Sequence, residues 1–161
     1  MEIIYHCANG KYPFHRPHHA KAYVEYLVPL NSPHQAQIFR HTTTLLKSLD
    51  CPYLLRLVKV LSDEKEVHCL YEHFETSLED HLSQVTAPDI ASILEQIKSV
   101  LAYLTETQIK AKISLDNVAV DHSGIVKLFF SPEIEILCQN DCQEHYATEF
   151  SRVRFDIEEL C

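Results

Sequence analysis

One helical pattern, between Pro88 and Gln108, constrains the fold of this chain more than any other sequence feature. Its apolar residues recur at intervals of three and four, the spacing that collects side chains on one face of an α-helix. They are Ile90, Ile93, Leu94, Ile97, Val100, Leu101 and Leu104. The pattern predicts a long helix with one buried apolar stripe.

Strand patterns lie on both sides of this helix. Residues 22–28 alternate as a strand, and residues 56–61 and 67–71 are typical of two strands around a polar turn. Residues 117–120 and 125–129 predict a β-hairpin with a glycine in its turn.

A second helix is expected between Pro33 and Leu49. Asn31 and Ser32 offer caps for its first turn, and Pro52 prevents the helix from growing further. This mixture of helices and strands indicates an α+β domain.

Composition excludes two kinds of partner. With 14 Lys and Arg against 23 Asp and Glu, the chain has a formal charge of −9 and would repel a nucleic-acid backbone. No apolar run approaches the ~18 residues of a membrane span.

The length suits a single domain with a sizeable core. The cysteines form no disulfide framework, so we expect reduced thiols and a cytoplasmic protein.

The stretch from residue 103 to residue 130 resembles the catalytic segment of a protein kinase that lacks the catalytic and metal-binding residues. Kinases carry H-R-D-L-x-x-x-N here, followed by a hairpin that ends in D-F-G. The shared Asn117 aligns the two sequences, and the D-F-G aspartate position then falls on Phe130. The H-R-D positions fall on Lys110, Ala111 and Lys112. The resemblance implies a degenerate kinase, a pseudokinase.

Other kinase-like motifs follow in the correct order. Residues 45–60 resemble the end of a kinase's helix αC, the His-Pro turn (here Cys51-Pro52) and the strand that follows that turn. Residues 66–82 are similar to the next kinase strand, the hinge and helix αD, with Tyr71 at the gatekeeper position. The helix predicted first would be αE.

Two narrower similarities point to non-catalytic relatives. The run Ile113-Ser114-Leu115-Asp116-Asn117 is similar to the degenerate domain of the general-control translation-initiation-factor kinase. The run Ser77-Leu78-Glu79-Asp80 is similar to the kinase-like domain of TBC-containing proteins. Both families use this domain for contacts rather than for phosphoryl transfer.

The resemblance also implies that the nucleotide-binding residues are lost. Glu25 stands at the position of the phosphate-binding lysine and Thr42 at that of its αC glutamate partner. A desolvated carboxylate at the first position would oppose phosphate. Lys112, at the position of the catalytic base, cannot accept a proton when charged. Asn117 is the one apparent survivor, and ordering the turn before a strand is its simpler role.

Glycine usage agrees with this loss. Only Gly10 and Gly124 occur in the chain. Kinases cover the ATP phosphates with G-x-G-x-x-G, because glycine lets backbone N–H groups approach phosphate closely. The corresponding residues 7–21 contain one glycine and two prolines, so no phosphate-cradling loop is expected.

The resemblance predicts an N-lobe at residues 1–74, with strands and αC, and a partial C-lobe at residues 75–161. The second part would contain αD, αE, the hairpin, a short activation segment closed by Ala147-Thr148-Glu149, and the start of αF at Asp156-Ile157. Because the match stops early in αF, we expect an open apolar face there. The candidate interaction residues are Phe39 on αC and Ile157 and Leu160 on αF.

These features favour a catalytically inactive kinase-like module that acts as a scaffold or allosteric regulator through protein contacts. No cofactor or metal is expected, and the partner would be a protein or the remainder of a longer chain. The sequence does not set the oligomeric state. The alternative is a divergent phosphotransferase that binds nucleotide in a rearranged site.

Zinc is a weaker hypothesis. Cys7 with His15, His18 and His19 offers donors, as do Cys138, Cys142 and His145. Neither set has the spacing of a zinc ribbon, so solvated loop histidines are the favoured interpretation.

Overall fold

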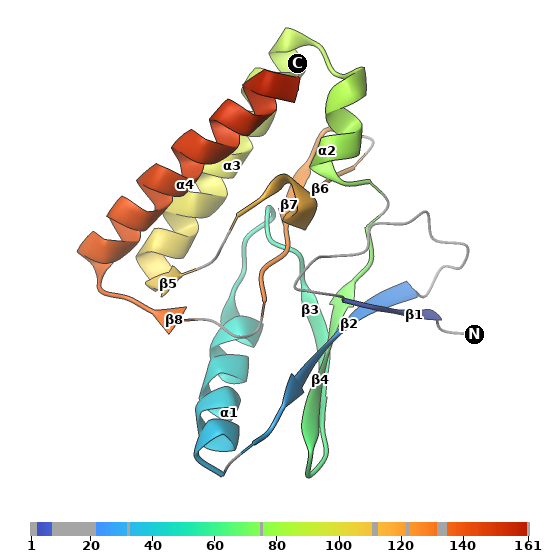
Figure 1. The fold of residues 1–161 in the computed structure, drawn as a ribbon, viewed down its shortest axis with the longest axis vertical. Helices are drawn as coiled ribbons and strands as arrows, with labels where there is room; N and C mark the ends of the chain where they lie inside the picture. Colours follow the sequence, from blue (N-terminus) through green and yellow to red (C-terminus); the bar gives the residue numbers. More distant parts are fainter. Residues whose placement is uncertain are drawn as a thin grey trace.

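A computed structural model gives the arrangement of most of the chain and has α+β architecture (Figure 1). The described residues are 3–7, 22–31, 33–74, 76–110, 113–121, 123–131 and 135–160. Figure 1 shows a helical layer and a sheet layer, with a small hairpin between them.

The sheet layer has four strands in the order β1-β2-β4-β3. They are β1 (Ile3–His6), β2 (Ala22–Pro29), β4 (Glu66–Glu72) and β3 (Leu57–Ser62). β1 runs parallel to β2, and the other pairs are antiparallel. The predicted strands at 22–28, 56–61 and 67–71 are therefore confirmed with small shifts at their ends.

One face of this sheet packs against helix α1 (Pro33–Ser48). Val24, Val28 and Phe39 are buried together in what we call the sheet cluster. Side chains alternate along a strand, so the residues between them face the other way. That opposite face exposes Leu27 of β2 and Leu61 of β3.

The helical layer consists mainly of two long helices, α3 (Ala87–Thr107) and α4 (Gln139–Leu160), which run antiparallel side by side (Figure 1). A capping box between Thr86 and Asp89 starts α3, and Gln108 ends it in a left-handed conformation with φ 62°. The predicted helix at 88–108 is confirmed, and its stripe is buried at Ile93, Ile97, Val100, Leu101 and Leu104.

Short elements connect these layers. The first is the single turn α2 (Leu78–His81), followed by the 3₁₀ turn η1 (Leu82–Gln84). After α3 come β5 (Ile109–Lys110), which pairs with β8 (Glu135–Ile136), and the 3₁₀ turn η2 (Leu115–Asn117).

The predicted hairpin is present as β6 (Val118–Val120) and β7 (Val126–Leu128). Its turn uses Gly124 at φ 81°, a conformation that suits glycine. Leu128 makes a bridge to Leu54, and Ala119 makes one to Ser77. The hairpin is thus bonded to the segment after α1 and to the start of α2.

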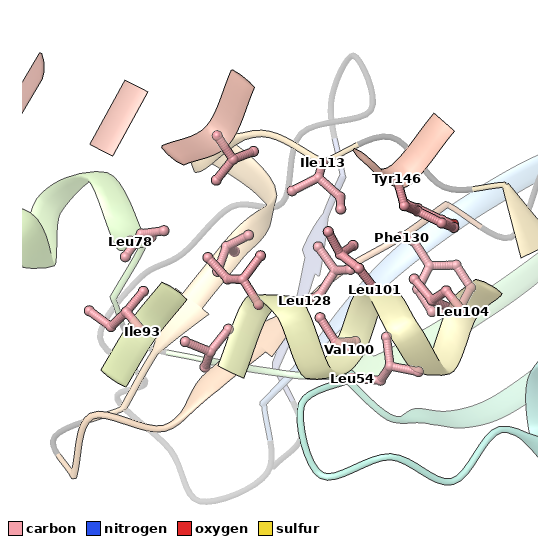
Figure 2. Close-up of a cluster of buried hydrophobic side chains, with 14 of the residues drawn as sticks. Leu54, Leu78, Ile93, Val100, Leu101, Leu104, Ile113, Leu128, Phe130 and Tyr146 are labelled. Atoms are coloured by element: carbon pink, nitrogen blue, oxygen red, sulfur yellow. The ribbon is translucent and has the colours of Figure 1, made fainter. Parts of the chain in front are cut away.

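The hairpin, α3 and α4 share the larger hydrophobic core, which we call the helical cluster. Figure 2 shows Leu101, Leu104, Ile113, Leu128 and Tyr146 converging on this core. Leu46 and Leu54, from the first part of the chain, also belong to it. The expected boundary near residue 74 lies between β4 and α2, yet the cores on its two sides exchange residues.

Three expectations for the C-terminal part are wrong. Residues 139–160 form one continuous helix, so Ala147-Thr148-Glu149 does not close a loop and no new helix starts at Asp156. Because α4 covers α3, Ile157 is fully buried rather than part of an open face. Phe39 is likewise buried under the sheet, so neither side chain is available to a partner.

Leu160 does remain half exposed, as expected. Among the described residues, no helix is both long and apolar enough to cross a membrane.

The buried stripe of α3 gives the first prediction. Ile97→Ala removes a fully buried side chain from the helical cluster and should lower the free energy of unfolding by about 2–5 kcal/mol. Urea denaturation measures this change. Glu95→Ala, at an exposed site on the same helix, is the control and should change it by about 0.5 kcal/mol or less. Equal midpoints for the two variants would contradict the buried position of Ile97.

Candidate functional site

Two phenylalanines follow β7, and the second of them, Phe130, is the residue that the kinase resemblance aligns with the D-F-G aspartate. Phe129 is fully buried and belongs to the sheet cluster. Phe130 is 6% exposed and belongs to the helical cluster. Two consecutive residues therefore pack into two different cores, as the alternation of an extended backbone allows.

Two tyrosines from the sheet complete this arrangement. The Tyr71 ring meets Phe129 edge-on at 5.0 Å between centroids, and the Tyr26 ring lies 6.5 Å from Phe129. The Tyr71 hydroxyl donates a hydrogen bond to the carbonyl oxygen of Phe130 at 3.3 Å. We call these four residues, Tyr26, Tyr71, Phe129 and Phe130, the aromatic bridge.

Backbone hydrogen bonds fix the aromatic bridge in place. The Phe129 N–H donates to the Asn117 carbonyl at 2.8 Å. Leu128 donates to the carbonyl of Tyr53, and Leu55 donates to the carbonyl of Leu128, both at 2.8 Å. The strand that leads into the bridge is therefore held from both sides.

Asn117, the residue shared with the kinase motif, takes part in contacts that order the backbone. It ends η2, and its carbonyl supports Phe129. The nearby Asp121 carboxylate accepts from the N–H groups of Ser123 and Ile125 at 2.8 and 2.9 Å, which orders the hairpin turn. Phe130 offers no ligand at the position where a kinase holds Mg²⁺ with aspartate.

The H-R-D positions are only partly visible. Lys110 is exposed on β5, while Ala111 and Lys112 lie outside the described residues. The next described residue is Ile113. Its N–H donates to Glu149 at 3.3 Å, and its carbonyl accepts from Arg152. Glu149, expected at the end of an activation segment, instead anchors this segment to α4.

Glu25 does not face the αC-like helix α1. Its neighbour Val24 packs with Phe39, so alternation turns Glu25 to the opposite face of the sheet. There it pairs with His6 at 3.2 Å and His68 at 3.1 Å. The carboxylate at the position of the phosphate-binding lysine in the kinase resemblance therefore lies on the face of the sheet opposite α1.

Thr42 is buried on α1, on the other side of the sheet from Glu25. The lysine–glutamate ion pair of active kinases thus has no counterpart between these two positions. On the same helix, the Thr43 hydroxyl donates to the Phe39 carbonyl at 2.8 Å, a local bond typical of helical threonine.

A cavity of about 370 Å³ opens beside the aromatic bridge. Tyr71 and Phe130 form part of its wall, together with leucines from α1 and from the segment that follows it. Its charged lining residues are Lys47, Asp50, Arg56, Glu72 and Lys127. The Glu72 carboxylate accepts from the Arg56 N–H at 2.8 Å and lies 4.0 Å from the Lys127 ammonium.

Potential metal ligands lie away from the aromatic bridge. In the described part of the chain, one group of three such residues has converging ligand atoms: Asp63, Glu66 and His68 at the β3–β4 turn. Of the zinc donors considered from sequence, Cys142 is buried in the helical cluster, whereas His15, His18 and His19 lie outside the described residues.

Sequence reasoning missed the polar side chains that position the hairpin and the helices. Gln96 of α3 donates to the Gly124 carbonyl at 2.9 Å and accepts from the Val126 N–H at 2.8 Å. The Tyr103 hydroxyl accepts from the Asp50 N–H at 2.8 Å and so ties α3 to the end of α1. The sequence signal for these contacts was a polar residue, Gln96, beside the apolar stripe of the predicted helix.

Comparisons with known proteins assign no family. No protein-family model matches the chain, and no curated protein matches it significantly. Its class therefore depends on its motifs and on the geometry described above.

The aromatic bridge gives the second prediction. Tyr71→Phe removes the hydroxyl bonded to Phe130 but keeps the ring, so it should cost about 0.5–1.5 kcal/mol of stability. Tyr71→Ala also removes the ring contacts and should cost about 3–5 kcal/mol. Urea denaturation separates the two effects. The control is Tyr53→Phe, at a half-buried tyrosine outside the bridge. Equal losses in Tyr71→Phe and Tyr71→Ala would contradict a packing role for the ring.

Proposed function

We propose that this chain is a catalytically inactive, kinase-like module that acts as a scaffold or allosteric regulator in the cytoplasm. The order of elements supports the kinase-like assignment. β2, α1, β3, β4, α2, α3 and the β6–β7 hairpin occur in this order. The motif resemblance implies the same order for a kinase strand, the αC helix, two more strands, the αD and αE helices and the segment before D-F-G.

The aromatic bridge is the observation that carries the proposal. Phosphoryl transfer needs room between sheet and hairpin for phosphate and Mg²⁺, and it needs carboxylates that hold the metal. Here Tyr26, Tyr71 and Phe129 fill that space with rings, and Phe130 stands in place of the aspartate. Filling it with apolar side chains favours a structural role over a catalytic one.

A module without catalysis would act through its surface, and α4 offers apolar anchors. Phe155 is 61% exposed and Leu160 is 50% exposed, whereas Val153 and Ile157 on the same helix are fully buried. Exposed aromatic and aliphatic side chains of this size are the usual anchors of protein interfaces. We therefore propose that a partner protein binds over the C-terminal end of α4, where both side chains are exposed.

A second candidate function is nucleotide binding in a rearranged site. The cavity beside the aromatic bridge favours it, because Lys47, Arg56 and Lys127 supply three cations to a space of about 370 Å³. Asp50 and Glu72 in the same lining reduce that positive charge, which favours the first candidate.

The third prediction separates the two candidates. ATP with Mg²⁺ at millimolar concentration should leave the melting temperature unchanged, because the aromatic bridge leaves no phosphate site. A nucleotide present at 100 times its dissociation constant would instead raise the melting temperature by about 5–10 °C in a chain of this size. Thermal unfolding with and without Mg²⁺ measures this.

The control for that experiment is the double variant Arg56→Ala and Lys127→Ala. A shift that Mg²⁺ strengthens and that this variant abolishes would place nucleotide in the cavity and support the phosphotransferase alternative. A shift that survives in the variant would also contradict the proposal, since nucleotide would then bind elsewhere.

The fourth prediction concerns the partner. Leu160→Asp and Phe155→Asp should each weaken capture of a partner from native cells by more than about 30-fold, which corresponds to about 2 kcal/mol. Gln143→Asp adds the same charge at an exposed position in the first half of α4 and should have little effect. Circular dichroism checks that each variant is folded. Equal capture by all four proteins would contradict an α4 interface.

A further inference from the structure

The turn between β3 and β4 brings an imidazole and two carboxylates together on the exposed side of the sheet. His68 Nε2 lies 3.5 Å from Asp63 Oδ2 and 3.5 Å from Glu66 Oε1. One ligand atom from each residue falls within 4.8 Å of the others. All three lie on the β3–β4 hairpin, so its strand pairing and its turn bring them together.

A fourth residue fixes the orientation of the imidazole. His68 Nδ1 lies 3.1 Å from Glu25 Oε2, and the Glu25 side chain is only 12% exposed. An ionised carboxylate can only accept, so Nδ1 carries the proton and donates it to this bond. In the neutral ring, the lone pair on Nε2 then faces two further carboxylates. That arrangement is repulsive unless a cation lies between them.

Hydrogen bonds within the turn also orient the Asp63 carboxylate. Asp63 Oδ1 accepts from the N–H groups of Lys65 and Glu66 at 2.7 and 2.8 Å. These two bonds hold the pKa of Asp63 below its usual value, so the group stays ionised. With Oδ1 occupied by the turn, the other oxygen, Oδ2, is the one that faces His68.

We propose that His68 Nε2, Asp63 and Glu66 bind a divalent transition-metal ion, with zinc as the best fit, while Glu25 orients His68 from behind. A carboxylate that accepts from the non-ligating nitrogen is the usual support of a metal-binding histidine. Water or a donor from another molecule occupies the fourth position. This site is independent of the proposed function, since it lies on the opposite face of β2 from the aromatic bridge.

The distances favour tetrahedral coordination. Zinc–nitrogen and zinc–oxygen bonds of about 2.0–2.2 Å at tetrahedral angles separate neighbouring ligand atoms by about 3.3–3.6 Å. Both separations from His68 Nε2 are 3.5 Å. Octahedral Mg²⁺ at about 2.1 Å would need separations near 3.0 Å, and it prefers oxygen to imidazole.

Isothermal titration calorimetry with zinc chloride on the metal-free full chain tests the site. The wild type should bind one equivalent of zinc that His68→Ala does not bind. Asp63→Asn keeps an oxygen for the turn but removes the charge, and should lose at least tenfold in affinity. Glu25→Gln should lose about 10–100-fold, the range typical of supporting residues.

Controls exclude zinc bound by other donors. His81→Ala removes a histidine from α2, away from the hairpin, and should bind like the wild type. Long-range nitrogen NMR of the imidazoles adds a direct readout: zinc should shift Nε2 of His68 while Nδ1 stays protonated. Equal zinc binding by wild type and His68→Ala, no zinc binding by the wild type, or equal heat from Mg²⁺ would each overturn the proposal.

Discussion

The contact on which this structure depends most is the pair Phe129–Phe130, because, together with Leu54, Leu55 and Leu57, it joins the two hydrophobic cores. The sheet cluster and the helical cluster each receive one of the two rings. Burial of an aromatic side chain contributes more apolar area than any aliphatic residue in these cores. Since the two rings are consecutive, neither core can shift without moving the other.

This double anchoring excludes a carboxylate from the position where the proposed kinase resemblance would place one. Aspartate at position 130 would place a carboxylate in an apolar core, at a free-energy cost that phenylalanine avoids. The hydroxyl of Tyr71 satisfies the carbonyl that remains in this buried place. The same residues that would complete a catalytic cleft thus stabilise the contact between sheet and helices, which favours a module working through its outer surfaces.

Local patterns predicted the parts of the fold that local physics controls. The stripe on α3 and the glycine turn of the hairpin depend on residues close in sequence. The continuity of α4 was missed because its polar residues outnumber its apolar ones and because Ala147-Thr148-Glu149 resembled the end of an activation segment. The direction of Glu25 was missed for a different reason: only the register of β2 against β4 decides which face it occupies. His68 and Glu25 are 43 residues apart, so no spacing rule brings them together.

β2 shows how one strand can serve both surfaces of the sheet. Val24, Tyr26 and Val28 turn toward α1 and the aromatic bridge, while Glu25 and Leu27 turn outward. Apolar packing on the inner side fixes the register, because a slip by one residue would expose the valines and bury the carboxylate. That register in turn holds Glu25 beside His68. The packing that fills the inner side with apolar side chains is therefore what gives the outer side its ordered imidazole and carboxylates.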